Sequence, residues 1–291
     1  DNGGPTTTMA LRVDSPAIDA GANPDLELFD QRGPGFSRQL GAGPDMGAFE
    51  LFDTSPGIRL VDGTLLVFGT EGRDNVRVRI QDERVRVQAR LNLGTADSTY
   101  RSFPYDPALV NKLEIYLRGG RDRATISQNV LVETRIDGGA GDDRIKGGGA
   151  ENILLGGAGN DQLRGGNDND ILLGGAGNDR LLGLAGSDIL SGNEGDDRLV
   201  GGPGSSADVL IGGTGEDNLN AGAGDDLLIG HHMEHEDDEA TLQIILQEWV
   251  ANPTALPGSL GALTEDGVRD VLIGGPGVDL LVSDSADDER P

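Results

Sequence analysis

The sequence predicts an all-β fold, a parallel β-solenoid, with one inserted amphipathic helix near the C-terminus. Ten nine-residue units of the form Gly-Gly-x-Gly-x-Asp-x-(Leu/Ile)-x run head to tail from Gly138 to Ile229. One fixed aliphatic residue and one fixed carboxylate in each period are typical of a chain that coils, each unit giving a short strand and a turn. The composition agrees, because 48 glycines and 3% aromatic residues do not suit a compact aromatic core.

Residues 1–52 are interrupted by glycine and proline and contain few apolar runs of strand length. They carry DNGGPT at Asp1, SPAIDAG at Ser15, DQRG at Asp30 and DMGAFE at Asp45. On these motifs the segment resembles the closing part of large secreted right-handed parallel β-helix proteins. The resemblance implies that residues 1–52 are the remnant of an upstream domain whose earlier coils precede Asp1. We expect this segment either to fold onto the next module or to stay loosely ordered.

Residues 53–137 are predicted to form a β-rich module that leads into the array. Val76, Val78 and Ile80 alternate with arginines, as expected for a half-buried sheet. Two degenerate copies of the repeat, GTEGRDNVR and GGRDRATIS, suggest that this module already coils. Asp74 and Asp122 in these copies are either weak calcium ligands or simple turn residues.

Residues 138–230 form the array itself, in which position eight points inward and its neighbours are expected to face solvent. One buried leucine contributes roughly 1.5–3 kcal/mol, whereas ordering the backbone costs about 1–2 kcal/mol per residue. A further stabilising group is therefore required. The glycine turns gather carbonyl oxygens beside an Asp, a hard-oxygen environment that suits Ca²⁺ better than the strictly octahedral Mg²⁺. Sixteen acidic residues against five basic ones between 138 and 229 also call for cations.

The array resembles the repeat-in-toxin (RTX, hemolysin-type) calcium-binding β-roll of secreted bacterial proteins. In that family two nonapeptides make one coil, and several Ca²⁺ ions lie between stacked turns. The resemblance implies carboxylate ligands at Asp143, Asp161, Asp170, Asp179, Asp188, Asp197, Asp208, Asp217, Asp226 and, beyond the array, Asp279. It implies carbonyl ligands in the same turns at Gly139, Gly141, Gly157, Gly159, Gly175, Gly177, Gly213 and Gly215.

Several units depart from the pattern, and we expect weak or empty sites there. Ala150 and Asn152 replace the fourth glycine and the aspartate of the second unit, and Asp168 replaces the fourth glycine of another. Leu184 and Asn193 stand at second-glycine positions. An insertion, Ser206-Ala207, makes the role of Asp208 the least certain.

Residues 231–291 are predicted to contain a helical excursion, residual repeats and a C-terminal cap. Leu242, Ile245, Leu246 and Trp249 fall on one helical stripe that ends before Pro253, and we expect Leu246 and Trp249 to cover the end of the solenoid. Repeat-like sequence returns from Glu265 and from Gly274, so that Asp270 and Asp279 extend the calcium candidates.

The string His231-His232-Met233-Glu234-His235 spells H-x-x-E-H, the inverted zinc-protease motif. On a helix, His231 and His235 would share a face and hold zinc. The surrounding sequence offers little chain from which to build a cleft, so we favour adventitious metal binding or a role in capping the helix. The sequence contains no H-E-x-x-H, no G-x-S-x-G and no cysteine.

We therefore expect a non-enzymatic, calcium-binding module of a secreted, extracellular protein that folds as it meets Ca²⁺ outside the cell. The resemblance adds type I secretion machinery as a partner. A net charge of −27 argues against nucleic acid and anionic membranes, no stretch is apolar enough to span a membrane, and we expect a monomer. The alternative is the accessory C-terminal region of an extracellular hydrolase or polysaccharide-processing enzyme whose catalytic domain lies upstream.

Overall fold

A computed structural model describes residues 39–40, 43–44, 56–92, 100–233, 236–253, 255–260, 263–264, 268–283 and 288–290. The chain divides into one unit of residues 1–55 with 60–62 and a second of residues 56–59 with 63–291. In the first unit the described strands β1 (Gln39–Leu40) and β2 (Gly43–Pro44) form an antiparallel pair. The rest of the predicted β-helix remnant, residues 1–52, lies outside the described residues.

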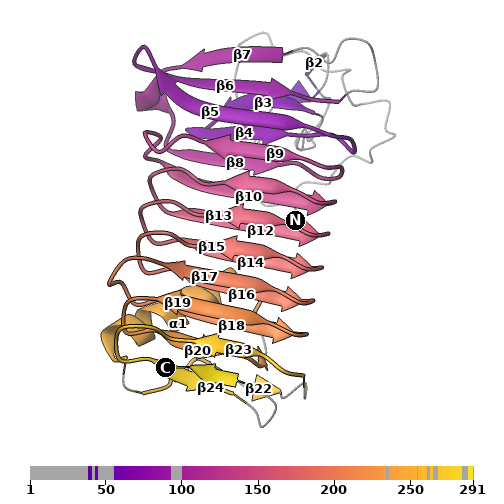
Figure 1. Ribbon diagram of the computed structural model, residues 1–291. Helices are drawn as coiled ribbons and strands as arrows, with labels where there is room; N and C mark the ends of the chain where they lie inside the picture. The colour runs from indigo at the N-terminus through magenta and orange to yellow at the C-terminus, as the bar shows by residue number, and fades with distance from the viewer. Residues whose placement is uncertain are drawn as a thin grey trace, which may run out of the picture. The chain divides into compact units, whose positions relative to one another are not determined.

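The second unit is built on two long sheets between which the chain alternates (Figure 1). The first sheet contains, in spatial order, β4 (Thr64–Phe68), β8 (Lys112–Tyr116), β10 (Glu133–Ala140), β12 (Asn152–Ala158), β14 (Ile171–Ala176), β16 (Ile189–Glu194), β18 (Val209–Thr214), β20 (Leu227–Ile229) and β24 (Leu280–Val282). The second contains β7 (Tyr100–Tyr105), β6 (Arg84–Arg90), β5 (Asn75–Gln81), β9 (Arg123–Ile126), β11 (Arg144–Lys146), β13 (Gln162–Arg164), β15 (Arg180–Leu182), β17 (Arg198–Gly202), β19 (Asn218–Gly222), β23 (Val271–Ile273) and β25 (Asp288–Arg290).

Neighbouring strands within the array are parallel, and one coil takes two nonapeptides. Leu154 pairs with Leu172 in the first sheet, and Leu163 pairs with Leu181 in the second, both 18 residues apart. The inward residues at position eight are 0–2% exposed and form the core between the sheets. The parallel β-solenoid predicted from the period is therefore confirmed.

The same two sheets continue into residues 63–137. β8 pairs in parallel with both β4 and β10, and β9 pairs with both β5 and β11. β5, β6 and β7 form an antiparallel meander at the end of the second sheet. The first hairpin turns at Asp82 and Glu83, whose φ angles of 51° and 57° are those that a two-residue type I′ turn requires. Smaller elements are β3 (Gly57–Val61), a 3₁₀ turn at Pro107–Leu109, and the antiparallel pair β21 (His232–Met233) and β22 (Leu263–Thr264).

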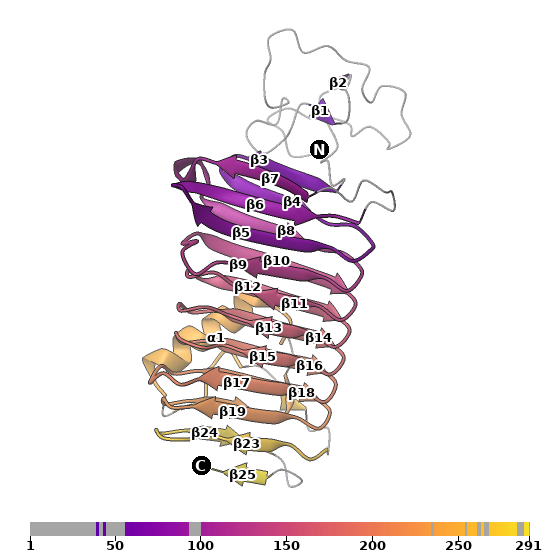
Figure 2. The same ribbon diagram turned by 45° about the horizontal axis from the view of Figure 1, so that its top comes forward.

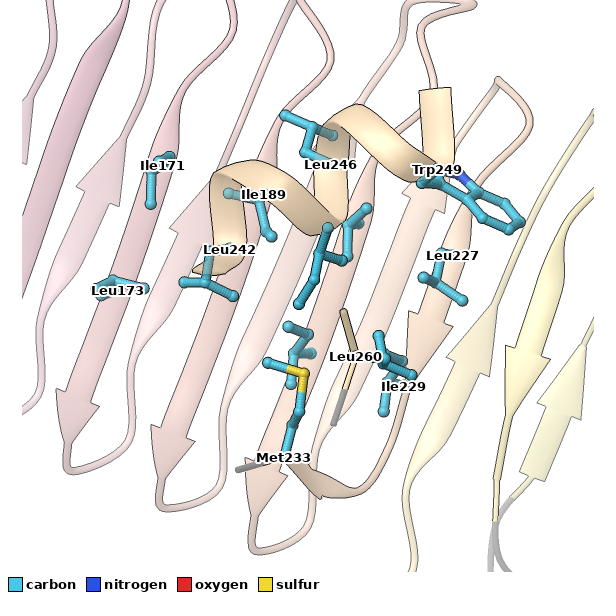
Figure 3. Packing of buried hydrophobic residues seen from close by; sticks show 13 residues of the cluster. Ile171, Leu173, Ile189, Leu227, Ile229, Met233, Leu242, Leu246, Trp249 and Leu260 are labelled. Carbon is cyan, nitrogen blue, oxygen red and sulfur yellow. The ribbon is translucent and has the colours of Figure 1, made fainter. Parts of the chain in front are cut away.

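The predicted helix is α1 (Glu239–Ala251), and the side chain of its N-cap, Asp238, accepts from the backbone N–H of Thr241 at 3.2 Å. The predicted apolar stripe is buried, but its position differs from our expectation. The helix packs on the outer face of the first sheet, across β14 to β20, and not over the end of the solenoid (Figures 2 and 3). It does so because that face carries outward aliphatic side chains that need cover, namely Ile171, Leu173, Ile189, Val209, Ile211, Leu227 and Ile229.

The expectation that position-eight neighbours face solvent is therefore wrong for this sheet. In the units that supply the first sheet, positions seven and nine are mostly aliphatic, and helix α1 buries them. Trp249 is fully buried, and its indole N–H donates to the carbonyl oxygen of Asp225 at 2.8 Å. The described residues contain no helix long and apolar enough to cross a membrane.

Candidate calcium sites in the glycine turns

The repeat aspartates stack in two rows, one along each edge of the solenoid. In each row the backbone N–H of one residue donates to Oδ1 of the equivalent residue one coil further on. The bonds of the first row measure 2.6–2.9 Å and join Asp74, Asp122, Asp143, Asp161, Asp179, Asp197, Asp217 and Asp270. Those of the second row measure 2.8–3.1 Å and join Asn152, Asp170, Asp188, Asp208, Asp226 and Asp279. All the predicted carboxylates thus lie in two regular series.

The second oxygen of most of these carboxylates has no hydrogen-bond partner. Oδ2 is buried and without one in Asp122, Asp143, Asp161, Asp179, Asp188, Asp197 and Asp226. The seven side chains are only 0–3% exposed. A buried carboxylate oxygen with neither a donor nor a cation is costly, so these turns require a positive partner.

Burial raises the pKa of these carboxyls, chiefly by desolvation. From an ordinary 3.8, the pKa rises to about 8 for Asp179 and to about 9 for Asp188, where the neighbouring Asp208 and Asp170 add repulsion. It rises to about 6 or 7 for Asp122, Asp143, Asp161, Asp170, Asp197, Asp208 and Asp226. A divalent cation beside the carboxylates would oppose both causes.

Glycine stands at the first position of these units and has no side chain. The aspartate carboxylate of the same unit occupies the space where a side chain would lie. A Cβ on Gly174 would lie 2.4 Å from Oδ2 of Asp179 and 2.7 Å from the carbonyl oxygen of Gly192, one coil further on. A carboxylate oxygen of the same unit and a carbonyl oxygen of the next coil approach the first glycine in the same way at Gly138, Gly156, Gly165, Gly183 and Gly192. In each of these turns a methyl group on the first glycine would collide with both oxygen atoms.

The glycines predicted to supply carbonyls share one backbone conformation. Gly139, Gly141, Gly157, Gly159, Gly175, Gly177, Gly213 and Gly215 have φ between 89° and 132°. At Gly157 a Cβ would lie only 2.0 Å from the carbonyl oxygen of Gly139, so glycine is required there for close stacking of the coils as well as for its φ.

The donor set fits a hard cation held mainly by main-chain oxygen. In the described part of the chain no three His, Cys, Asp or Glu side chains converge, so a site must combine one or two carboxylates with carbonyls. The chain has no cysteine for softer metals. Six to eight oxygens in irregular geometry are what Ca²⁺ accepts and Mg²⁺ does not.

The departures from the repeat have distinct outcomes. The side-chain amide of Asn152 donates to the carbonyl of Ala150 at 2.6 Å and to Oδ1 of Asp170 at 2.7 Å. An aspartate at this position could not donate these bonds and would need a cation in their place. Leu184 and Asn193 keep the turn, with φ of 94° and 74°. The Ser206-Ala207 insertion leaves the row intact, because the N–H of Asp188 still donates to Asp208 at 2.9 Å.

Both rows extend beyond the array. Asp122 repeats the array geometry, whereas the carboxylate of Asp74 accepts from the N–H groups of Thr70 at 2.6 Å and Asn92 at 2.7 Å. Asp74 therefore has the contacts of a turn residue, whereas Asp122 shares the contacts of the array aspartates. At the other end, Asp217 and Asp226 bond across the helical excursion to Asp270 and Asp279, 53 residues away.

The histidine string does not form the zinc-protease helix. Residues 232–233 form the short strand β21, and helix α1 starts only at Glu239. Nδ1 of His232 lies 2.8 Å from Oε1 of Glu236, while both ring nitrogens of His231 are buried without a partner among the described residues. Glu234 and His235 lie outside the described residues.

Comparison with known proteins bears on the array. Residues 137–172, 147–181, 173–206 and 203–231 match the family model of the RTX calcium-binding nonapeptide repeat in four copies. Residues 137–231 are an RTX array. This RTX segment is about a third of the chain. No curated protein and no solved structure matches the chain.

Proposed function

We propose that the RTX array binds several Ca²⁺ ions through its two rows of aspartates and that this binding drives folding outside the cell. The observation that carries the proposal is the set of buried Oδ2 atoms without a partner. Because the unfolded chain has no preformed site, the free energy of metal binding becomes free energy of folding.

The ligands that we propose are the predicted aspartates, Asp279 included, and the predicted glycine carbonyls, with Asp122 added at the N-terminal end. Asp122 has the same buried, unpartnered Oδ2 as the array residues, and Asp279 accepts from the N–H of Asp226. We exclude Asn152 from the set, because its amide donates where a carboxylate would need a cation.

A low-calcium interior would keep such a chain unfolded until export, and RTX proteins in general are secreted. We therefore propose an extracellular structural and secretion module that uses a type I system. The net charge of −27 supports this role, since acidic repulsion opposes premature folding without cations.

The test is circular dichroism together with the fluorescence of Trp249, the only tryptophan, in Ca²⁺, in Mg²⁺ and in chelator. We expect much more β-structure and a much more deeply buried Trp249 in Ca²⁺ than in Mg²⁺ or chelator, where the folded state is only partly populated. Equal β-content and equal Trp249 emission in chelator would refute calcium-driven folding.

A further inference from the structure

The outer face of the second sheet carries a cluster of basic residues, although the net charge of the molecule is −27. On strands β9 to β17 the outward positions carry six basic residues, which we call the basic face: Arg123, Arg144, Lys146, Arg164, Arg180 and Arg198. The other outward strand residues there are Thr125, Gln162, Leu182 and Val200, so the strands place no carboxylate on this face.

The basic side chains lie in columns set by the strand register. Arg123 pairs with Arg144, which pairs with Gln162, then Arg180, then Arg198. Lys146 and Arg164 are paired in a second column two residues along the strands. Successive rungs are therefore about 4.7–4.9 Å apart, and the columns about 7 Å apart.

Within the described part of the chain, none of these six side chains forms an ion pair. The ion pairs that the structure forms use other basic residues, such as Arg121 with Asp142 and Lys112 with Glu133. The four arginines of the first column are exposed to solvent. The column borders a hollow of about 590 Å³, whose rim also includes Asp142 and residues of the first aspartate row. A ligand must therefore stay over the strands and avoid the acidic turns.

We propose that the basic face binds an anionic polysaccharide, a linear chain of uronate sugars that runs across the strands. The guanidinium fork of arginine donates two parallel hydrogen bonds to a planar carboxylate. The length that one pyranose unit adds to a linear chain is about the spacing between successive rungs. A ribbon-like chain lying between the two columns of basic residues therefore presents carboxylates to both columns. The net charge of −27 does not oppose this binding. At physiological salt, charges that lie more than about 8 Å from the ligand are largely screened.

Other polyanions fit the face less well. An extended acidic peptide repeats its side chains on one side every ~6.6 Å, out of step with the rungs. Single-stranded nucleic acid normally adds base stacking on aromatic rings, and the outward positions of β9 to β17 contain none. An anionic membrane is a plane, which would also meet the acidic turns on either side of the strands.

The test is fluorescence anisotropy of a labelled oligogalacturonate, too short to gel with calcium, titrated with the full chain in Ca²⁺. Arg144→Gln should weaken binding roughly threefold, and Arg123→Gln, Arg144→Gln and Arg180→Gln together roughly thirtyfold. Glutamine is a sound replacement because Gln162 already occupies one rung. Lys112→Gln, the same change of charge on the other sheet, should leave affinity unchanged, and added salt should weaken binding by the wild type.

Circular dichroism of each variant separates lost charge from lost fold, and repetition in chelator shows whether unfolding alone abolishes binding. Equal affinity of the triple variant and the wild type in Ca²⁺ would overturn the proposal. So would equal binding of neutral dextran, or tighter binding of single-stranded DNA. Salt-sensitive self-association that the triple variant abolishes would assign the face to a second copy of this chain instead.

Discussion

Replacing Asp179 by asparagine should change stability in opposite directions with and without calcium. Asp179 is 1% exposed, its Oδ1 accepts from the N–H of Asp161 at 2.7 Å, and its Oδ2 has no partner. Asparagine preserves the shape and the Oδ1 bond but removes the charge. Asn152 shows that an amide can occupy this position, donating to the turn carbonyl and to the next carboxylate.

The magnitude follows from the pKa of Asp179, which burial raises from 3.8 to about 8. Each pKa unit corresponds to about 1.4 kcal/mol of free energy. Relaxation of the protein and penetration of water reduce the cost of the buried charge below the value that the whole pKa shift would give. We expect Asp179→Asn to stabilise the calcium-free fold by on the order of 2 kcal/mol near neutral pH. In saturating calcium the variant should instead be less stable than the wild type, because one carboxylate ligand is lost.

Urea unfolding in chelator and in Ca²⁺, followed by Trp249 fluorescence and circular dichroism, measures both effects. The control is Asp196→Asn, the same change of charge at exposed position five, where Asn160 and Asn178 already occur. The control should shift neither curve by more than a few tenths of a kcal/mol. If Asp179→Asn lowers stability equally in both buffers, or if the control matches it, the carboxylate is not a ligand and the reasoning fails.

Three further outcomes are expected. In chelator, stability should fall as pH rises from about 4 to about 8, because the raised pKa of Asp179 lets the folded chain bind more protons than the unfolded one in that range; urea unfolding at a series of pH values should show this slope, and saturating calcium should flatten it. Gly174→Ala should destabilise the calcium-loaded protein by about 1–3 kcal/mol, whereas Gly204→Ala, whose Cβ would meet nothing closer than 3.5 Å, should be neutral in the same assay. Leu246→Ala should cost about 2 kcal/mol and expose Trp249 to solvent, which a red shift of its emission would report; unchanged emission would mean that α1 docks without this contact.

The coil and the carboxylate positions follow from the period of the sequence. A fixed leucine and a fixed aspartate every nine residues leave few structures that bury the first and align the second, so position eight in the core was predictable. The hydrogen bonds between coils were not, because they depend on which backbone N–H faces which Oδ1 after stacking. The hydrogen bond from Asp217 to Asp270 was the hardest to predict, because a helical excursion separates the two residues in the sequence.

The sequence also repeats with a period of eighteen residues. This longer period distinguishes the units that supply the first sheet from those that supply the second. Position seven is Arg, Gln, Arg, Arg and Asn in the units that supply the second sheet, but Ile, Ile, Ile, Val and Leu in those that supply the first. Comparison of alternate units would have located the covered face. A single nine-residue consensus hides this alternation, and with it the face that helix α1 covers.

This alternation gives the two outer faces different roles on one scaffold. Position eight is aliphatic in every unit and position six is Asp in every unit but that of Asn152, because both sheets share one core and both edges carry aspartates. Position seven is free of that constraint. It is aliphatic beneath Leu246 and Trp249 on one face, and on the other it is arginine in three of five units. If the unpaired arginines served only solubility, carboxylates would do as well, since acidic residues otherwise outnumber basic ones by 50 to 23. Six basic residues with no strand carboxylate among them on one face of an acidic chain therefore favour a ligand-binding role over a purely solvating one.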